Sequence, residues 1–339
     1  DVPAGFLALC SKNLTDCAVT PSEHFNTVLY TGNASVRSET GVGFQPDLVW
    51  IKSRTSTYSH RIYDAVRGVT KELQSDTVIA EATQTGGVTA FGSDGFSLGT
   101  YGPVNNTGDS FVAWDWKAGN SSGSSNGDGT ITSTVTVNSD AKFSIVKWAG
   151  DSSESATVGH GLGVIPDVLI CKEMNGTDWW HFRHGSLATT HNMFPNETNA
   201  SRTDANVSGH IADLTSTTVF GFTSSGGGVY DNVVAVNESG KNNIAYCWAE
   251  VEGFSKFGSY EGNGNADGTF VYCGFSPAFI MTKSVDSTSA WQIFDNKREG
   301  YNADNDVLEA NTTAAETTTD YIDILSNGFK CRITTDPNV

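Results

Sequence analysis

The sequence is poor in charged residues, and poorest in basic ones. Charged side chains make up 17% of its 339 residues, with 20 Lys and Arg against 38 Asp and Glu, so the formal net charge is −18. A protein that binds nucleic acid needs a basic surface to neutralise phosphates. No cluster of Lys or Arg supplies such a surface here, which excludes nucleic acid as a partner.

Long hydrophobic runs are also missing. No stretch of about 18 apolar residues could cross a bilayer, and no basic amphipathic helix could lie on one. Hydrophobic residues still make up 38% of the chain and aromatic residues 11%, which is enough to build a core. These values exclude membrane insertion and general disorder.

Glycine, threonine, serine and asparagine are abundant instead. The chain has 36 Gly, 38 Thr, 35 Ser and 25 Asn, which together make up about 40% of it. Threonine is favoured in strands, while Gly, Asn and Ser are favoured in turns. The composition therefore predicts an all-β fold of short strands joined by many turns.

One pattern occurs three times along the chain. A Gly-x-x-Pro turn is followed by an apolar strand that ends in lysine, at residues 43–52, 163–172 and 274–283. Each copy follows another expected strand, at 27–30, 143–148 and 254–260, and precedes an aromatic strand, at 60–64, 179–183 and 291–295. Short strands between Gly, Asn and Ser turns predict tandem antiparallel β-sandwich modules of the jelly-roll kind.

These copies predict the organisation of the whole chain. The segments expected are an N-terminal strand segment (1–23), a first repeat (24–119), a flexible Gly/Ser linker (120–128), a second repeat (129–253) and an incomplete third repeat (254–339). The closing strand of the first two repeats, at 110–116 and 243–248, has no counterpart after residue 331. A sandwich without this strand would expose unpaired backbone groups.

The N-terminal segment has the character of the missing strand. Phe6, Leu7, Ala8, Leu9 and Cys10 match the closing-strand patterns at 111–115 and 244–247. In one explanation the sequence is part of a longer chain and the match is chance. In the other, each subunit donates this strand to the third repeat of its neighbour, and such heterologous strand addition generates an open filament.

Several motifs together resemble a known family. They lie at residues 43–54, 61–68, 71–75, 93–99, 159–163, 249–260 and 294–302. They resemble an uncharacterised β-rich repeat family, with GFxPDLVWIK-type repeats, in structural and tail-fibre-like proteins of marine and environmental bacteriophages. The resemblance implies a virion or surface-fibre module without assigned catalytic residues. The sequence departs from that family in its missing final strand, its extra cysteines and its many glycosylation motifs.

Asparagine glycosylation motifs are about twice as frequent as chance predicts, with ten present against about five expected from composition. They lie at Asn13, Asn33, Asn105, Asn120, Asn175, Asn196, Asn199, Asn206, Asn237 and Asn311. Occupied motifs would give the protein a glycan-coated extracellular surface. In a protein of a bacterial virus they would be a consequence of composition alone.

The six cysteines form no zinc-binding pattern. Cys10 and Cys17 are close enough in sequence to close a small disulfide loop, which favours an oxidising compartment. The other four allow three pairings that the sequence does not rank. In the alternative, several of them are small buried hydrophobic residues.

No catalytic constellation is visible. His181, His184 and His191 would suit a metal on a helix, but the repeat pattern places His181 on a strand. The pairs Asp64 with Glu72 and Asp295 with Glu299 lack the surroundings of a glycosidase site. Asp- and Asn-rich turns at 126–129, 263–268 and 302–306 offer oxygen ligands for calcium, although Asn-Gly turns explain them as well. We expect no enzyme and no cofactor.

Two adjacent tryptophans give the last hint. Trp179 and Trp180 should face opposite sides of a strand, so one is expected at an interface or against a glycan. The main hypothesis is a non-enzymatic, extracellular or virion-surface structural protein that self-assembles into a fibre by strand complementation. The alternative is a phage tail-fibre adhesin for host glycans, and a glycan depolymerase comes third.

Overall fold

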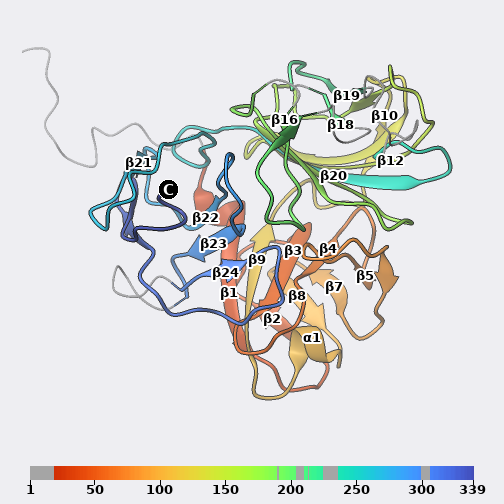
Figure 1. Ribbon diagram of the computed structural model, residues 1–339. Coiled ribbons are helices and arrows are strands. Elements are labelled where there is room, and N and C mark those ends of the chain that lie inside the picture. Colours follow the sequence, from red (N-terminus) through yellow and green to blue (C-terminus); the bar gives the residue numbers. More distant parts are fainter. Residues whose placement is uncertain (1–18, 189–190, 204–209, 213, 224–235, 299–305) are drawn as a thin grey trace, which may run out of the picture.

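The computed structural model describes residues 19–188, 191–203, 210–212, 214–223, 236–298 and 306–339 (Figure 1). Regular structure in these residues is almost entirely strand, with one 3-10 helix, η2 (Pro21–Glu23), and one short α-helix, α1 (Gly102–Asn105). All ladders between named strands are antiparallel. The expected all-β sandwich fold is confirmed.

The first repeat contains two facing sheets. One has the order β1-β9-β3-β4 and the other β2-β8-β7, with β5-β6 as a small ribbon. The strands are β1 (Phe25–Thr31), β2 (Arg37–Thr40), β3 (Leu48–Ser53), β4 (Arg61–Asp64), β5 (Lys71–Glu72), β6 (Ala82–Thr83), β7 (Val88–Gly92), β8 (Gly95–Leu98) and β9 (Ser110–Trp116).

The second repeat has the same arrangement, with two further strands at one edge of its main sheet. Its main sheet has the order β10-β11-β12-β20-β14-β15, its second sheet β13-β19-β18, and its ribbon is β16-β17. The strands are β10 (Ser124–Asn126), β11 (Ser133–Asn138), β12 (Phe143–Ala149), β13 (Thr157–Gly159), β14 (Val168–Glu173), β15 (His181–His184), β16 (His191–Asn192), β17 (Arg202–Thr203), β18 (His210–Ile211), β19 (Val219–Thr223) and β20 (Asn242–Trp248). The segment expected to be a flexible linker at 120–128 instead contains β10, which pairs with β11.

The third repeat is smaller. Its sheets have the orders β22-β23-β24 and β21-β26-β25. The strands are β21 (Phe270–Tyr272), β22 (Phe279–Thr282), β23 (Gln292–Asp295), β24 (Leu308–Glu309), β25 (Ile322–Leu325) and β26 (Gly328–Cys331). The strand expected at 254–260 is not formed. Its counterparts β1 and β12 both pair with a closing strand, β9 or β20, and the described part of the third repeat has no such strand.

The three repeats meet around one common core (Figure 1). The apolar residues of β3, β14 and β22 alternate between two cores. In β3, Leu48 and Trp50 face the common core, while Val49 and Ile51 face the core inside the first sandwich. This explains why the repeated apolar segments lack the alternation of a half-exposed strand.

Two rings of hydrogen bonds join the repeats in a closed cycle. In one ring the Trp180 Nε1 donates to Gln74 O at 2.7 Å, the Trp291 Nε1 to Phe194 O at 3.1 Å, and the His60 Nε2 to Glu309 O at 2.9 Å. His60 can donate from Nε2 because its Nδ1 accepts from Trp50 Nε1. Each donor and each acceptor occupies the same position in its repeat.

The second ring is formed by main-chain groups alone. The amides of Glu81, Ser201 and Glu316 donate to the carbonyls of Met174, Val285 and Arg54, at 2.6, 2.8 and 2.8 Å. The first repeat thus bonds the second, the second bonds the third, and the third returns to the first. The third repeat is therefore part of the same closed body as the other two.

The lysine that ends each repeated motif fixes the following loop. Lys52, Lys172 and Lys283 each donate from Nζ to the carbonyls one and four residues later in the chain. Burial lowers the pKa of each ammonium to about 8. The repeated lysine is a structural anchor.

Candidate assembly site at the third repeat

One side of β22 has no strand partner among the described residues. In the first two repeats the equivalent strands, β3 and β14, lie between a closing strand and the next strand of the sheet. β22 pairs with β23 alone. We call the other side of β22 the open edge.

The alternation of the ladder shows which groups face the open edge. The amide of Asn296 donates to the carbonyl of Ala278, so Ala278 faces β23. Successive residues of an antiparallel strand turn their main-chain groups to opposite sides. The main-chain groups of Phe279, Met281 and Lys283 therefore face the open edge.

The side chains along the open edge are apolar and incompletely covered. Phe279 and Met281 are half-buried against the common core, whereas Leu48, Trp50, Val168 and Ile170, at the same positions in the other repeats, are buried. On the other face, Ile280 belongs to the core of the third sandwich. A strand added here would complete the cover of both cores.

The third repeat also lacks the residue that anchors a closing strand at its exit. The Asp47 carboxylate accepts from the amides of Ala118 and Asn120, at 2.7 and 3.0 Å, directly after β9. The Asp167 carboxylate accepts from the amide of Glu250 at 2.7 Å, after β20. The equivalent residue is Ala278. A strand at the open edge would thus be held by fewer bonds than β9 or β20.

Each closing strand also reaches across to a neighbouring repeat. Trp114 Nε1 of β9 donates to Asp295 Oδ2 of the third repeat at 2.9 Å, and Tyr246 OH of β20 donates to Asp64 Oδ2 of the first at 2.7 Å. An arginine three residues later, Arg298 or Arg67, pairs with each carboxylate. We call these two clusters the charged corners.

Each charged corner also contains a second carboxylate. Arg298 bonds Glu316 at 2.9 Å, and Arg67 lies 3.4 Å from Glu81. This pattern is not visible when Asp64 and Asp295 are compared only with other acidic residues, such as Glu72 and Glu299. The spacing Asp-x-x-Arg at equivalent positions of two repeats was the available signal.

The same positions of the second repeat carry different residues. His184, Leu187 and Ser201 stand where the charged corners have Asp, Arg and Glu. Leu187 is buried in the common core, and His184 Nδ1 accepts from the amide of Ser186 at 2.9 Å. By the cyclic order of the repeats, this third corner is the one that a closing strand of the third repeat would meet.

Comparison with known families identifies the chain only by its domain. A family model described as a domain of unknown function, DUF7483, matches residues 20–338. The chain belongs to this family. No curated protein and no solved structure matches it.

The DUF7483 match spans all three repeats as one unit, in agreement with the closed cycle of contacts. No helix in the described residues is long and apolar enough to cross a membrane.

After β26 the chain turns to the loop at 261–269, where the buried Asn338 bonds Asn263 and the carbonyl of Asn265. These last residues do not pair with β22.

The glycosylation candidates fall into different environments. Asn33, Asn120, Asn175 and Asn199 are exposed, while Asn196 and Asn311 are half-buried and accept hydrogen bonds from the amides of Trp180 and Trp291. Asn13 and Asn206 lie outside the described residues. Asn105 and Asn237 are fully buried. The folded DUF7483 domain leaves no room for a glycan on either side chain, so the expectation that these two are glycosylation sites is wrong for the folded protein.

The adjacent residues Trp179 and Trp180 lie in different surroundings. Trp180 is buried between the second and first repeats, where its Nε1 donates to Gln74 O, so Trp179 is the more exposed of the two. Trp179 is half-buried against Phe194, and the guanidinium of Arg202 lies 5.1 Å from its ring. His181 lies on strand β15, as expected.

The cysteines that the structure describes are free. Cys171, Cys247 and Cys331 are buried and Cys273 is half-buried. Burial raises the pKa of all four thiols, that of Cys247 to about 12. Cys10 and Cys17, the pair expected to form a disulfide, and Phe6, Leu7, Ala8 and Leu9 lie outside the described residues.

The candidate calcium turns are closed by internal bonds. Asn126 Nδ2 donates to Asp128, and Asp267 pairs with Lys330. The turn at 302–306 lies mostly outside the described residues. Glu173, Asp178 and Glu238 bring carboxylate oxygens within 4.8 Å of one another, but the Lys241 ammonium already lies 2.9 Å from Glu173 and 3.6 Å from Glu238.

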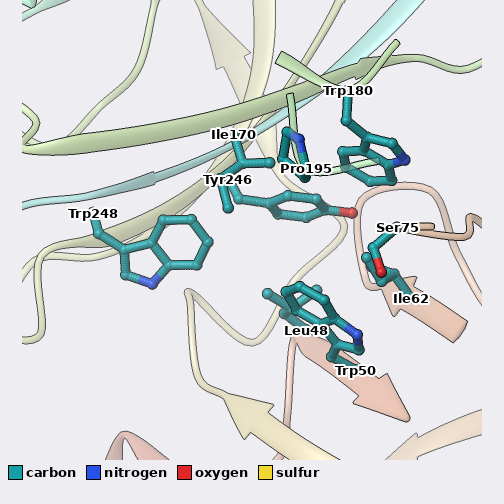
Figure 2. Close-up of a pocket in the computed structure, with 9 residues that line it drawn as sticks. All are labelled: Leu48, Trp50, Ile62, Ser75, Ile170, Trp180, Pro195, Tyr246 and Trp248. Atoms are coloured by element: carbon teal, nitrogen blue, oxygen red, sulfur yellow. The ribbon is translucent and has the colours of Figure 1, made fainter. Parts of the chain in front are cut away.

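A pocket lined by described residues is far smaller than a typical small-molecule site. Figure 2 shows its lining at the junction of the first two repeats, where Trp50, Trp180, Tyr246 and Trp248 converge with aliphatic side chains. The cavity measures about 10 Å³, room for about one water molecule, whereas small-molecule pockets measure about 300–1,000 Å³. The open edge of β22 is therefore the stronger candidate for a functional surface.

Proposed function

We propose that this protein is a non-enzymatic structural subunit that assembles head-to-tail by adding a strand of one copy to the open edge of another. The observation that carries the proposal is the pairing of β22, which has a ladder on one side only within the described residues. Unpaired strand edges template the addition of another strand.

The form of the assembly follows from the surfaces involved. Donor and acceptor are different parts of the chain, so each copy can give one strand and receive another. Such a heterologous contact grows into an open filament unless the rotation between copies closes a ring. The net charge of −18 keeps the other surfaces of neighbouring copies apart.

The proposed place of action is an extracellular or virion surface. It is supported by the resemblance to phage fibre-like repeats and by the polar turns with exposed glycosylation motifs at Asn33, Asn120, Asn175 and Asn199. No arrangement of side chains in the described residues favours the glycan-binding adhesin over the fibre subunit, since Trp180 is buried and Trp179 packs against Arg202.

The test is a substitution that blocks the open edge without removing its side of the core. Met281→Pro deletes the amide that faces the open edge, and proline is tolerated where the amide of an edge strand has no partner. Concentrated wild-type protein should form filaments in negative-stain microscopy, and Met281→Pro should remain small in light scattering.

Met281→Leu is the matched control. It keeps the amide and the volume of the side chain, so it should assemble like the wild type. Filaments in Met281→Pro, with the circular dichroism of the wild type, would contradict strand addition at β22. A wild type that stays monomeric at every concentration would contradict the fibre.

A further inference from the structure

The closing strands define what a strand at the open edge must look like. In the ladders, Ala113 and Ala245 lie opposite Ile51 and Cys171, and Val112 and Ile244 lie opposite Lys52 and Lys172. The pattern is a branched apolar residue, then alanine, then a large residue that faces the common core. Leu7, Ala8 and Leu9 have this pattern, and Cys10 corresponds to Cys247.

The third corner supports the same assignment independently. At the charged corners, the large closing-strand residue is Trp114 or Tyr246, and its polar tip donates to an aspartate. At the third corner the aspartate and arginine are replaced by His184 and Leu187. Leu9, which has no polar tip, suits this less polar corner. The polar partner is thus missing from both sides of the contact.

The start of the described chain lies beside the open edge. The ring of Phe25 is 5.8 Å from that of Phe279, and the ring of His24 is 6.0 Å from that of Phe254. A strand antiparallel to β22 would end opposite Phe279, at this same place. Residues 11–18 can span roughly 26–29 Å when extended, so they can connect such a strand to Val19 within one chain.

We propose that residues 6–10 close the third repeat of their own chain, antiparallel to β22, with Ala8 opposite Thr282 and Leu9 toward His184 and Leu187. The inference rests on the open edge used in the proposed function and adds the step before assembly. A short tether gives an effective concentration in the millimolar range. The chain's own strand therefore excludes a neighbour's strand at micromolar concentration, and assembly requires an exchange.

The register can be tested with the natural Cys10 as a probe. Ile280 and Thr282 turn their main-chain groups to β23, so they form non-hydrogen-bonded pairs with the added strand, where Cα atoms lie about 4.5 Å apart. Full-length Ile280→Cys, with Cys17→Ser to remove the nearby competitor, should form a disulfide between Cys10 and the introduced thiol within one chain. The protein is reduced and then oxidised with glutathione at micromolar concentration.

Met281→Cys is the matched control, because its side chain points to the opposite face from Cys10. Peptide mapping should show about tenfold more Cys10 in the disulfide for Ile280→Cys than for Met281→Cys. In case Ile280→Cys does not fold, Ala8→Cys with Thr282→Cys tests the same register. The second repeat already has cysteine at the position of Thr282, in Cys171.

Each outcome decides a different question. An intramolecular disulfide that blocks assembly until it is reduced supports self-closure. Disulfides formed only between chains at high dilution overturn self-closure and leave the fibre standing. No disulfide at the designed register in either variant overturns residues 6–10 as the strand. A self-closed monomer that never assembles, even when reduced and concentrated, overturns the proposed function alone.

Discussion

The second and third repeats share a strand pattern, yet only the second has a complete main sheet in the described residues. Residues 143–149 form β12, which pairs with β11 and β20, while the similar sequence at 254–260 forms no strand. The segment at 254–260 has no closing strand beside it, and it also contains Gly258 and has Lys256 and Phe257 where β12 has the β-branched Ile145 and Val146. Strand formation at this position therefore depends on both the closing strand and local propensity.

The largest test of this difference is proline at the same position of both repeats. Ile170→Pro removes an amide from an interior strand of a six-stranded sheet and should unfold the second repeat, a loss of more than about 3 kcal/mol. Met281→Pro should cost less than half as much, because only the added strand is lost. Urea unfolding followed by tryptophan fluorescence measures both.

Equal losses from the two prolines would show that β22 is as firmly enclosed as β14. The proposed difference between the second and third repeats would then be wrong, and β22 would have no open edge. Ile170→Val is the control for the side chain, and it should cost about 1 kcal/mol.

The corners provide a second contrast. Asp295→Ala leaves the fully buried Arg298 without its closest carboxylate and should destabilise the fold by about 3–5 kcal/mol. His184→Ala, at the same position of the second repeat, removes one bond to the amide of Ser186 and should cost about 1 kcal/mol. Thermal unfolding of the two variants compares them directly, and similar losses would remove the distinction between charged and third corners.

The sequence was sufficient for the fold class and the strand pattern because both depend on local composition and spacing. The apolar segments that end in Lys52, Lys172 and Lys283 were recognisable as strands, and they are β3, β14 and β22. The linker at 120–128 was misjudged because Ser124–Asn126 has a flexible composition but a ladder partner in β11. Local composition does not show such a partner.

The candidate site was only partly predictable for a related reason. The need for a strand at the third repeat was visible from the repeat pattern. The ring bonds of His60, Trp180 and Trp291 join residues far apart in the chain, so they required the structure. Burial of Asn105 and Asn237 was hidden in the same way, since their motifs look like those on exposed loops.

A further test weakens the closing strand of the second repeat, so that this repeat becomes more like the third. The first repeat has a buried carboxyl group on its closing strand. Asp115 of β9 lies where β20 has Cys247, and both of its carboxyl oxygens are buried without a hydrogen-bond partner in the described residues. Burial raises the pKa of Asp115 well above its ordinary value. The folded state therefore holds a proton that the unfolded state releases above about pH 4.

Cys247→Asp should make the second repeat pH-dependent in the same sense. Because the folded state binds the extra proton, its stability is greatest below about pH 4 and falls by about 1.4 kcal/mol per pH unit until the folded carboxyl ionises. Asp115→Cys is the reverse control and should remove the part of the natural slope that Asp115 contributes, while other acids with a raised pKa, such as Asp47, keep theirs. Urea unfolding between about pH 4 and pH 7 measures both. A Cys247→Asp variant whose stability does not change over this range would mean that this face of β20 is open to solvent, and the second repeat would then be no more closed than the third.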